Sequence, residues 1–182
     1  MKTSRPRKAT RFVAFLRAIN VGGHTVKMDR LRALFESLDF ENVETFIASG
    51  NVVFESAAKG DAVLEARIEK HLAKGLGYEV GTFVRSGEEV AAVAKQQPFD
   101  APAGASLFVM FLKEPLDRGI WKKVRDLRCP TDDFQTKGRE VYWLTHRGFS
   151  GSTVAPAFGK LCAAGTMRNI TTVRKLAAKY GF

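Results

Sequence analysis

The sequence predicts an α+β fold made of two ferredoxin-like (split βαβ) halves with extra C-terminal helices. Short runs such as 12–16 and 107–112 are apolar on both alternating faces, which is typical of strands covered on both sides. Segments such as 28–38 place apolar residues every three or four positions, which is typical of amphipathic helices. These two kinds of segment follow one another as βαββαβ in the first half and as βαββ in the second.

The elements of the first half are predicted from periodicity and from their boundary residues. They are a strand at 12–16, a helix at 28–38, hairpin strands at 45–48 and 52–55, a helix from 61 to 75 or 77, a strand at 79–85 and a short helix at 88–95. Asp61 and Ser86 are expected to cap the two later helices, because such side chains accept hydrogen bonds from free N–H groups of the first turn.

The second half is predicted in the same way. Its elements are a strand at 107–112, a helix at 116–127, hairpin strands at 133–136 and 140–145, and a final helix at 172–180. Residues 146–170 are expected to be loop-like, with a helical turn at 155–161. We see no sequence repeat between the halves, so we expect them to share the order of their strands and helices but not their sequence.

The predicted domain organisation has four parts. Residues 1–11 form a disordered basic arm, and residues 12–96 form the N-terminal half. Residues 97–105 contain two prolines and a glycine and are the predicted linker. Residues 106–182 form the C-terminal half.

Charge and composition limit the class of protein. The net charge is +10, and residues 1–11 and 141–182 contribute five and six cations without any acid. This asymmetry favours an anionic partner, either a small molecule or a nucleic acid. No apolar run is long enough for a membrane helix, and Arg17 interrupts the first apolar run too early for a signal peptide. Two cysteines without CxxC spacing are expected to be reduced thiols of a cytoplasmic protein, which could be a monomer or a dimer.

The first candidate site follows the first strand. Arg17, Asn20, Gly22 and Gly23 lie where that strand leads into a helix, and Lys27 lies at the helix start. An arginine can hold a phosphate or carboxylate through two parallel hydrogen bonds, and glycines let the backbone come close to a ligand. The alternative is that the arginine binds loop carbonyls while the glycines only turn the chain.

The second and third candidate sites are the turn at 49–51 and the segment at 166–172. Ser49 and Asn51 flank Gly50 in a predicted tight turn, and they are either ligand-binding or simply turn residues. Three residues at the start of the last helix could bind an anion or serve as its N-cap: Arg168, Asn169 and Thr172.

These motifs carry a resemblance. Residues 15–56, which include FLRAINVGG and IASGNVVFES, resemble the opening signature of the domain-of-unknown-function 1697 family, which is mainly bacterial and has no assigned activity. Thr166–Val173 resembles that family's second motif. The resemblance strengthens the functional interpretation of Ser49 and Asn51, but it implies no reaction.

Other motifs are missing. The glycine spacing matches neither a dinucleotide-binding nor a phosphate-loop motif, and the three histidines have no metal-binding spacing, so neither a cofactor nor a metal is predicted. The sequence therefore predicts a protein that binds an anionic ligand, a nucleotide or nucleic-acid phosphate, in a crevice between the halves. The alternatives are an enzyme acting on a small phosphorylated or carboxylated substrate, with unknown catalytic residues, and a self-associating structural protein.

Overall fold

The computed structural model describes residues 9–20, 23, 25–47, 50–58, 60–100 and 104–182. The chain divides into two compact units, the first ending at Val90 and the second beginning at Ala91. The predicted linker at 97–105 therefore lies within the second unit, and most of the predicted arm lies outside the described residues.

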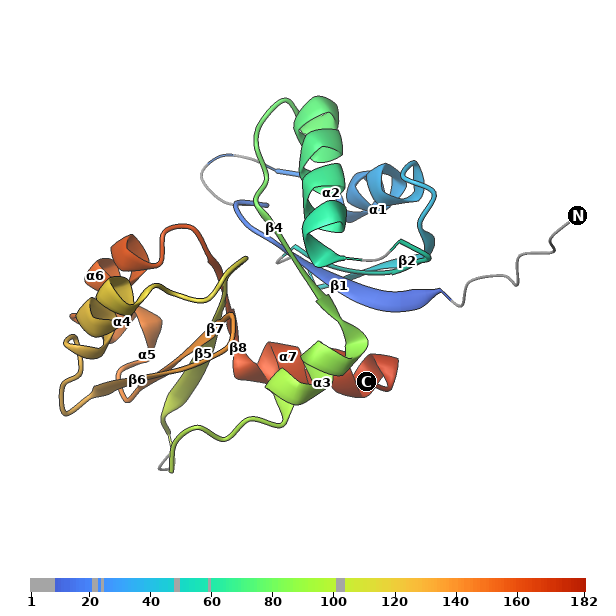
Figure 1. The fold of residues 1–182 in the computed structure, drawn as a ribbon. Helices are drawn as coiled ribbons and strands as arrows, with labels where there is room; N and C mark the ends of the chain where they lie inside the picture. Colours follow the sequence, from blue (N-terminus) through green and yellow to red (C-terminus); the bar gives the residue numbers. More distant parts are fainter. Residues whose placement is uncertain (1–8, 21–22, 24, 48–49, 59, 101–103) are drawn as a thin grey trace, which may run out of the picture. The chain divides into compact units, whose positions relative to one another are not determined.

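The first unit contains a four-stranded antiparallel sheet in the order β2-β3-β1-β4. In chain order its elements are β1 (Thr10–Leu16), α1 (Met28–Glu36), β2 (Glu41–Phe46), β3 (Asn51–Ser56), α2 (Asp61–Leu76) and β4 (Thr82–Ser86), followed by α3 (Gly87–Ala94), which crosses the boundary. This is the βαββαβ order and strand arrangement of a ferredoxin-like fold (Figure 1).

The second unit repeats this topology. Its elements are β5 (Ser106–Phe111), α4 (Arg118–Arg125), β6 (Asp132–Lys137), β7 (Glu140–Thr145), α5 (Gly148–Gly151), α6 (Ala155–Leu161), β8 (Thr166–Asn169) and α7 (Ile170–Tyr180). The strand order is β6-β7-β5-β8, so the first, second, third and fourth strands occupy the same places as in the first sheet. The predicted fold class is confirmed.

Each unit has an apolar core between its sheet and its helices. In the first unit, Phe12 and Phe54 of the sheet pack with Leu31 and Phe35 of α1 and with Ile68 of α2. The exclusion of these side chains from water stabilises the unit, since burial of each is worth about 2 kcal/mol. In the second unit, α4 and α6 form a corresponding core around Trp143 and Phe158.

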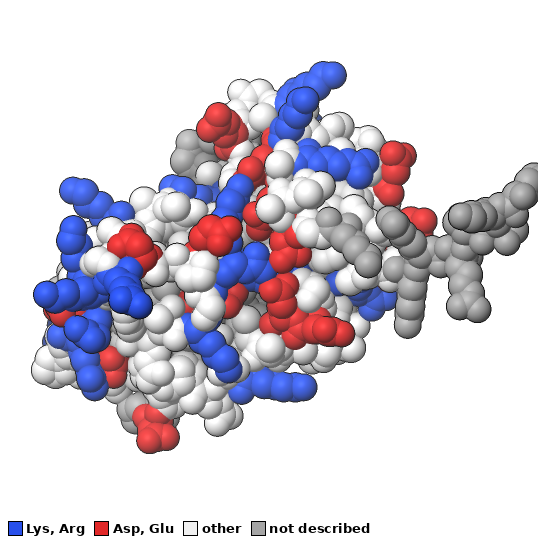
Figure 2. Space-filling model, in the orientation of Figure 1, with Lys and Arg blue, Asp and Glu red and all other residues white. Residues whose placement is uncertain are grey.

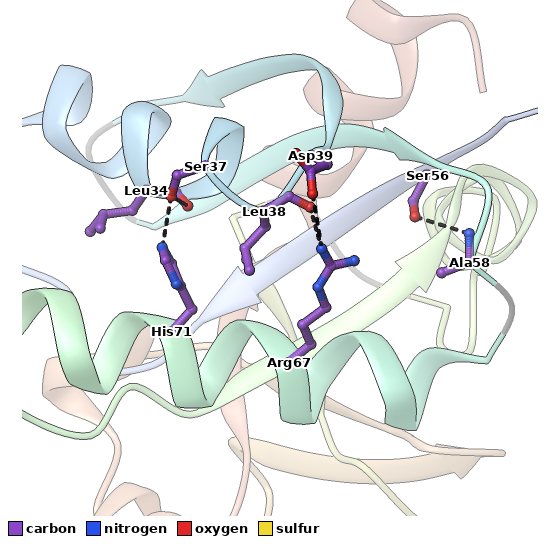
Figure 3. Close-up of polar contacts among 8 residues, drawn as sticks. All are labelled: Leu34, Ser37, Leu38, Asp39, Ser56, Ala58, Arg67 and His71. Atoms are coloured by element: carbon purple, nitrogen blue, oxygen red, sulfur yellow. Dashed lines mark hydrogen bonds and ion pairs between the residues drawn. The ribbon is translucent and has the colours of Figure 1, made fainter.

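Polar contacts join α1 to α2 on the side of the first sheet that both helices cover (Figure 3). His71 Nε2 and Ser37 Oγ are 2.8 Å apart, which gives this histidine a structural partner. Arg67 Nη2 donates to the carbonyl oxygen of Leu38 at 2.6 Å and lies 3.8 Å from a carboxylate oxygen of Asp39. The chain that leaves α1 is thereby held against α2.

The edge strand β4 is protected by glutamates. The N–H groups of Thr82 and Val84 donate to Glu69 Oε1 and Glu65 Oε1 of α2, each at 2.9 Å. The Ser86 N–H donates to Glu89 Oε2, and Ser86 Oγ accepts from the Glu89 N–H, which is a capping box at the start of α3. Unpaired edge N–H groups can recruit another strand, so these carboxylates block edge-to-edge association along β4.

Three local predictions are wrong. Phe46 pairs with Asn51, so the first hairpin has a four-residue connection rather than a tight two-residue turn. Asp61 begins α2 and Gly60 is its N-cap, with φ 97°. Within the segment 146–170, which was predicted to be loop-like, residues 148–151 form α5 and residues 166–169 form β8.

The strand β8 escaped prediction because four residues are too few to show periodicity. It pairs with β5, with Thr166 opposite Phe111 and Asn169 opposite Phe108. Gly165 allows this pairing: a Cβ atom there would lie 2.6 Å from Met110 Sδ and 2.8 Å from the carbonyl oxygen of Phe111. Only glycine lets the backbone approach β5 so closely.

Candidate functional site

The first two predicted segments do come together within the first unit. The Leu16 N–H donates to the carbonyl oxygen of Gly50 at 2.7 Å. A Cβ on Gly50 would lie 3.2 Å from the Cβ atoms of both Leu16 and Ile19, and Gly50 has φ 73°. The glycine of the second motif is therefore required for close packing against the first motif. Gly22 and Ser49 lie outside the described residues.

The two asparagines of these segments hold the backbone. Asn51 is fully buried, and its Nδ2 donates to the carbonyl oxygen of Phe46 at 3.0 Å, across the end of the hairpin. Asn20 has φ 57°, and its Oδ1 accepts from the Val26 N–H at 2.6 Å. The Asn20 contact spans the connection between β1 and α1, and the Asn51 contact spans the end of the β2–β3 hairpin, so both support the structural interpretation of these residues.

The cations of the first predicted site are exposed. Arg17 donates its backbone N–H to the carbonyl oxygen of Gly81 at 2.7 Å, and its side chain has no hydrogen bond or ion pair with a described residue. Lys27 is the N-cap residue of α1 and Gly23 is exposed with φ 88°. A pocket of about 330 Å³ at Gly81 is lined by two glutamates and one lysine, which does not suit an anion.

The predicted residues of the third segment separate into two kinds. Arg168 is 9% exposed, and its Nη1 donates to Thr166 Oγ1 at 2.9 Å and to the carbonyl oxygen of Met167 at 2.8 Å. Burial lowers the pKa of this guanidinium to about 10. Asn169 is the N-cap of α7, and its Oδ1 accepts from the Thr171 N–H at 2.8 Å. Thr172 is half-buried in the first turn of the helix.

A pocket of about 460 Å³ lies at this helix start, entirely within the second unit. Its polar lining includes Gln97, Ser106, Asn169, Thr171 and Arg174, and its apolar lining includes Phe99, Leu107 and Ile170. The first turn of α7 carries no acidic residue, so its positive dipole end is not offset there by a carboxylate.

Arg174 is the charged residue of this pocket, and the sequence prediction did not include it. Its Nε donates to the carbonyl oxygen of Ala94 at 3.1 Å and its Nη2 to that of Gln96 at 3.3 Å. Its Nη1 has no hydrogen bond with a described residue. The sequence did contain a signal for Arg174. It lies four positions after Ile170, so on a helix the two side chains share one face, and Arg174 lies one turn after the first helical residue.

A second pocket of the same unit, of about 360 Å³, surrounds a buried carboxylate. Its lining includes Cys129, Asp132 and His146. Asp132 is 2% exposed; its Oδ1 accepts from Trp143 Nε1 at 2.9 Å and from Ser152 Oγ at 2.8 Å, and its Oδ2 accepts from Thr131 Oγ1 at 2.7 Å.

The environment of Asp132 shifts its acidity. Burial by itself raises the pKa of this carboxyl, but hydrogen bonds from Thr131, Ser152, Trp143 and Thr145 outweigh it and leave the pKa below the usual value. With its oxygens engaged by several donors, this ionised group joins the hairpin to the α5 region.

The described residues contain neither a metal site nor a membrane-spanning helix. Among the residues that the structure describes, no group of three His, Cys, Asp or Glu side chains could hold a metal ion. No helix in the described ranges has both the length and the apolar character needed to cross a bilayer.

The single crevice expected from the sequence stays a prediction. It would be lined by the three segments 17–23, 49–51 and 166–172.

Comparisons with known proteins agree with the fold. The chain is similar to a solved structure described as conserved bacterial protein SP0830 from Streptococcus pneumoniae, with 23% sequence identity and a TM-score of 0.73 over 96% of this chain and 99% of that one. No curated protein shows significant similarity. The family model described as a protein of unknown function, DUF1697, matches residues 9–142. This span includes the predicted first signature, while Thr166–Val173 lies beyond it; the chain belongs to the DUF1697 family.

Proposed function

We propose that this protein binds a small anionic ligand, of the size of a phosphate ester or mononucleotide, in the pocket at the start of α7. The observation that carries the proposal is the state of Arg174. Two of its guanidinium nitrogens are held by the carbonyl oxygens of Ala94 and Gln96, while Nη1 has no described partner. A guanidinium that is already oriented loses less conformational entropy when it binds a phosphate or carboxylate.

The surroundings of Arg174 support the same ligand class. The N-terminal end of a helix favours negative charge, and this one is lined by Asn169 and Thr171. Phe99 and Leu107 supply an apolar wall on which the organic part of a ligand can pack. The volume of about 460 Å³ suits one small molecule.

The test is titration calorimetry with inorganic phosphate and adenosine monophosphate. Asn169→Asp is the decisive variant, because aspartate keeps the helix cap but places a negative charge beside the ligand. We expect Asn169→Asp and Arg174→Gln to weaken binding by about tenfold or more. Lys175→Gln is the matched control, since it removes a neighbouring exposed cation that does not line the pocket.

Three results would contradict the proposal: no binding of either probe at millimolar concentration, unchanged binding in Asn169→Asp, or equal losses in Lys175→Gln and Arg174→Gln. Phosphorus NMR spectra of the same samples address the enzyme alternative. A substrate-dependent product signal that Arg174→Gln abolishes would favour an enzyme acting on a phosphorylated molecule over a binding protein.

A further inference from the structure

The eight-residue helix α4 carries an unusual group of free charges. Arg118, Lys122, Lys123 and Arg125 are all exposed, and none of them forms a hydrogen bond or ion pair with a described residue. Two exposed arginines of the first unit are paired instead: Arg11 is bound by Glu55, and Arg32 by Asp29 and Glu36. We call the four α4 side chains the α4 basic face.

The charge of the whole chain is concentrated in the unit that carries this face. Residues 91–182 contain fifteen lysines and arginines but only seven aspartates and glutamates, whereas residues 1–90 contain fourteen and twelve. Figure 2 shows Lys and Arg side chains gathered over the part of the second unit where Figure 1 places α4. Such a field attracts a polyanion.

Helix stability does not account for the α4 basic face. The helix dipole favours cations in the last turn, which explains Lys122, Lys123 and Arg125, but it disfavours Arg118 in the first turn. Arg118 and Lys122 are also four residues apart, a spacing at which like charges destabilise a helix. The acid beside Arg118 is already engaged, because the Asp117 carboxylate caps the helix through two backbone N–H groups.

The apolar side of the helix is used within the unit. Val124 is fully buried, and Ile120 and Trp121 pack against the core around Trp143. No apolar stripe is left to insert into a lipid surface, which disfavours an amphipathic membrane anchor. Only the charged side is available to a partner.

The spacing of the cations fits a nucleic-acid backbone. Arg118, Lys122 and Arg125 follow one another at intervals of four and three, so they form one stripe along the helix. At a rise of about 1.5 Å per residue the stripe is about 10 Å long, which corresponds to about three base steps of a duplex. We propose that the α4 basic face binds the phosphodiester backbone of double-stranded nucleic acid, without base specificity.

The test is fluorescence anisotropy of the full chain with a labelled 20-base-pair DNA duplex and its RNA counterpart, from 50 to 200 mM salt. The test variant replaces Arg118, Lys122, Lys123 and Arg125 by Gln. The control variant replaces Lys70, Lys74, Lys95 and Lys175 by Gln, so both lose the same charge from exposed positions. Circular dichroism checks that both variants are folded. The double variant Lys122→Gln/Lys123→Gln removes two of the four charges, so its affinity for duplex should lie between those of the wild type and the α4 variant.

We expect the α4 variant to bind duplex about a hundredfold more weakly at 50 mM salt, and its logarithmic salt slope to shrink by about 3 to 4, since each phosphate contact contributes about 0.9. The control variant should keep most of the affinity and slope. Equal losses in the two variants would show that net charge alone acts, and would overturn the assignment to α4. Absence of wild-type binding at 50 mM salt, or α4-dependent binding to phosphatidylserine vesicles but not to duplex, would also overturn it.

Discussion

Arg85 and Arg168 occupy the same position in the two sheets. Arg85 lies opposite Val13, and Arg168 lies opposite Val109, each in the fourth strand of its unit and one residue before a helix cap. Both are buried, and in both the Nη1 atom donates to the carbonyl oxygen of the preceding residue at 2.8 Å. This correspondence indicates that the buried arginine belongs to the repeated architecture.

We expect Arg168→Ala to destabilise the protein by about 2 to 4 kcal/mol, because it removes a large buried side chain and leaves Thr166 Oγ1 and the Met167 carbonyl without this donor. Arg85→Ala should have an effect of the same size. Urea unfolding measures both, with exposed Lys175→Ala as the control. An Arg168→Ala protein of full stability that no longer binds phosphate would instead make Arg168 a ligand residue.

Asn20 offers a test of backbone strain. Asn20→Ala loses the acceptor for the Val26 N–H and places alanine at φ 57°, whereas Asn20→Gly loses only the acceptor. We therefore expect the alanine variant to be less stable than the glycine variant by about 1 kcal/mol. Thermal unfolding of the two proteins checks this order, and the reverse order would contradict a structural role for the loop conformation.

Asp132 should make stability depend on acidity. Its native pKa is below the usual value, so the unfolded chain takes up the proton first as the pH falls. The contribution of ionised Asp132 to the free energy of unfolding is therefore fully present above about pH 4, which is the pKa in the unfolded chain. It is lost as the pH falls through the native pKa.

Asp132→Asn should cost about 3 kcal/mol at pH 7, because an amide nitrogen cannot accept the hydrogen bonds that a carboxylate oxygen accepts. The difference in the free energy of unfolding between Asp132→Asn and the wild type should be smaller at pH 3 than at pH 7. Urea unfolding at the two pH values measures it, with Asp133→Asn as the neighbouring control. A difference that is constant with pH would mean that the charge of Asp132 does not contribute.

The glutamates on α2 should control the edge of the first sheet. Glu65 is 3% exposed, and Glu65→Ala leaves the Val84 N–H without its side-chain acceptor, so we expect a loss of about 2 kcal/mol and faster hydrogen exchange at Val84. Glu65→Gln keeps an acceptor oxygen and is the matched control. Unchanged exchange at Val84 in the alanine variant would show that Glu65 does not protect the strand.

The two cysteines should react at very different rates. Burial raises the pKa of Cys162 to about 11, and its side chain is 2% exposed, whereas Cys129 is half-buried beside a pocket. A thiol reagent at pH 8 should label one cysteine in the native protein and two after unfolding. Cys129→Ser should abolish the native reaction, and fast labelling of Cys129→Ser would contradict the burial of Cys162.

The sequence determined the fold class because local patterns carry it. The two apolar strand runs, the helical periodicity of 28–38 and the capping residues Ser86 and Asn169 depend on neighbours within one turn or one strand. The runs FVAFL at 12–16 and FVMFL at 108–112 each predicted a strand that is covered on both faces. Their equivalence became evident only from the pairings of Phe12 with Ser86 and of Phe108 with Asn169.

Tertiary structure decided what the polar residues do. Residue type could not distinguish a ligand-binding Arg168 from one buried in β8, nor predict that Arg174 would be held at a pocket by carbonyls some 80 positions away in the chain. Asp132 likewise gathers donors from residues up to 20 positions distant. Burial and hydrogen bonding depend on contacts that chain folding brings together, and single-sequence periodicity contains no record of those contacts.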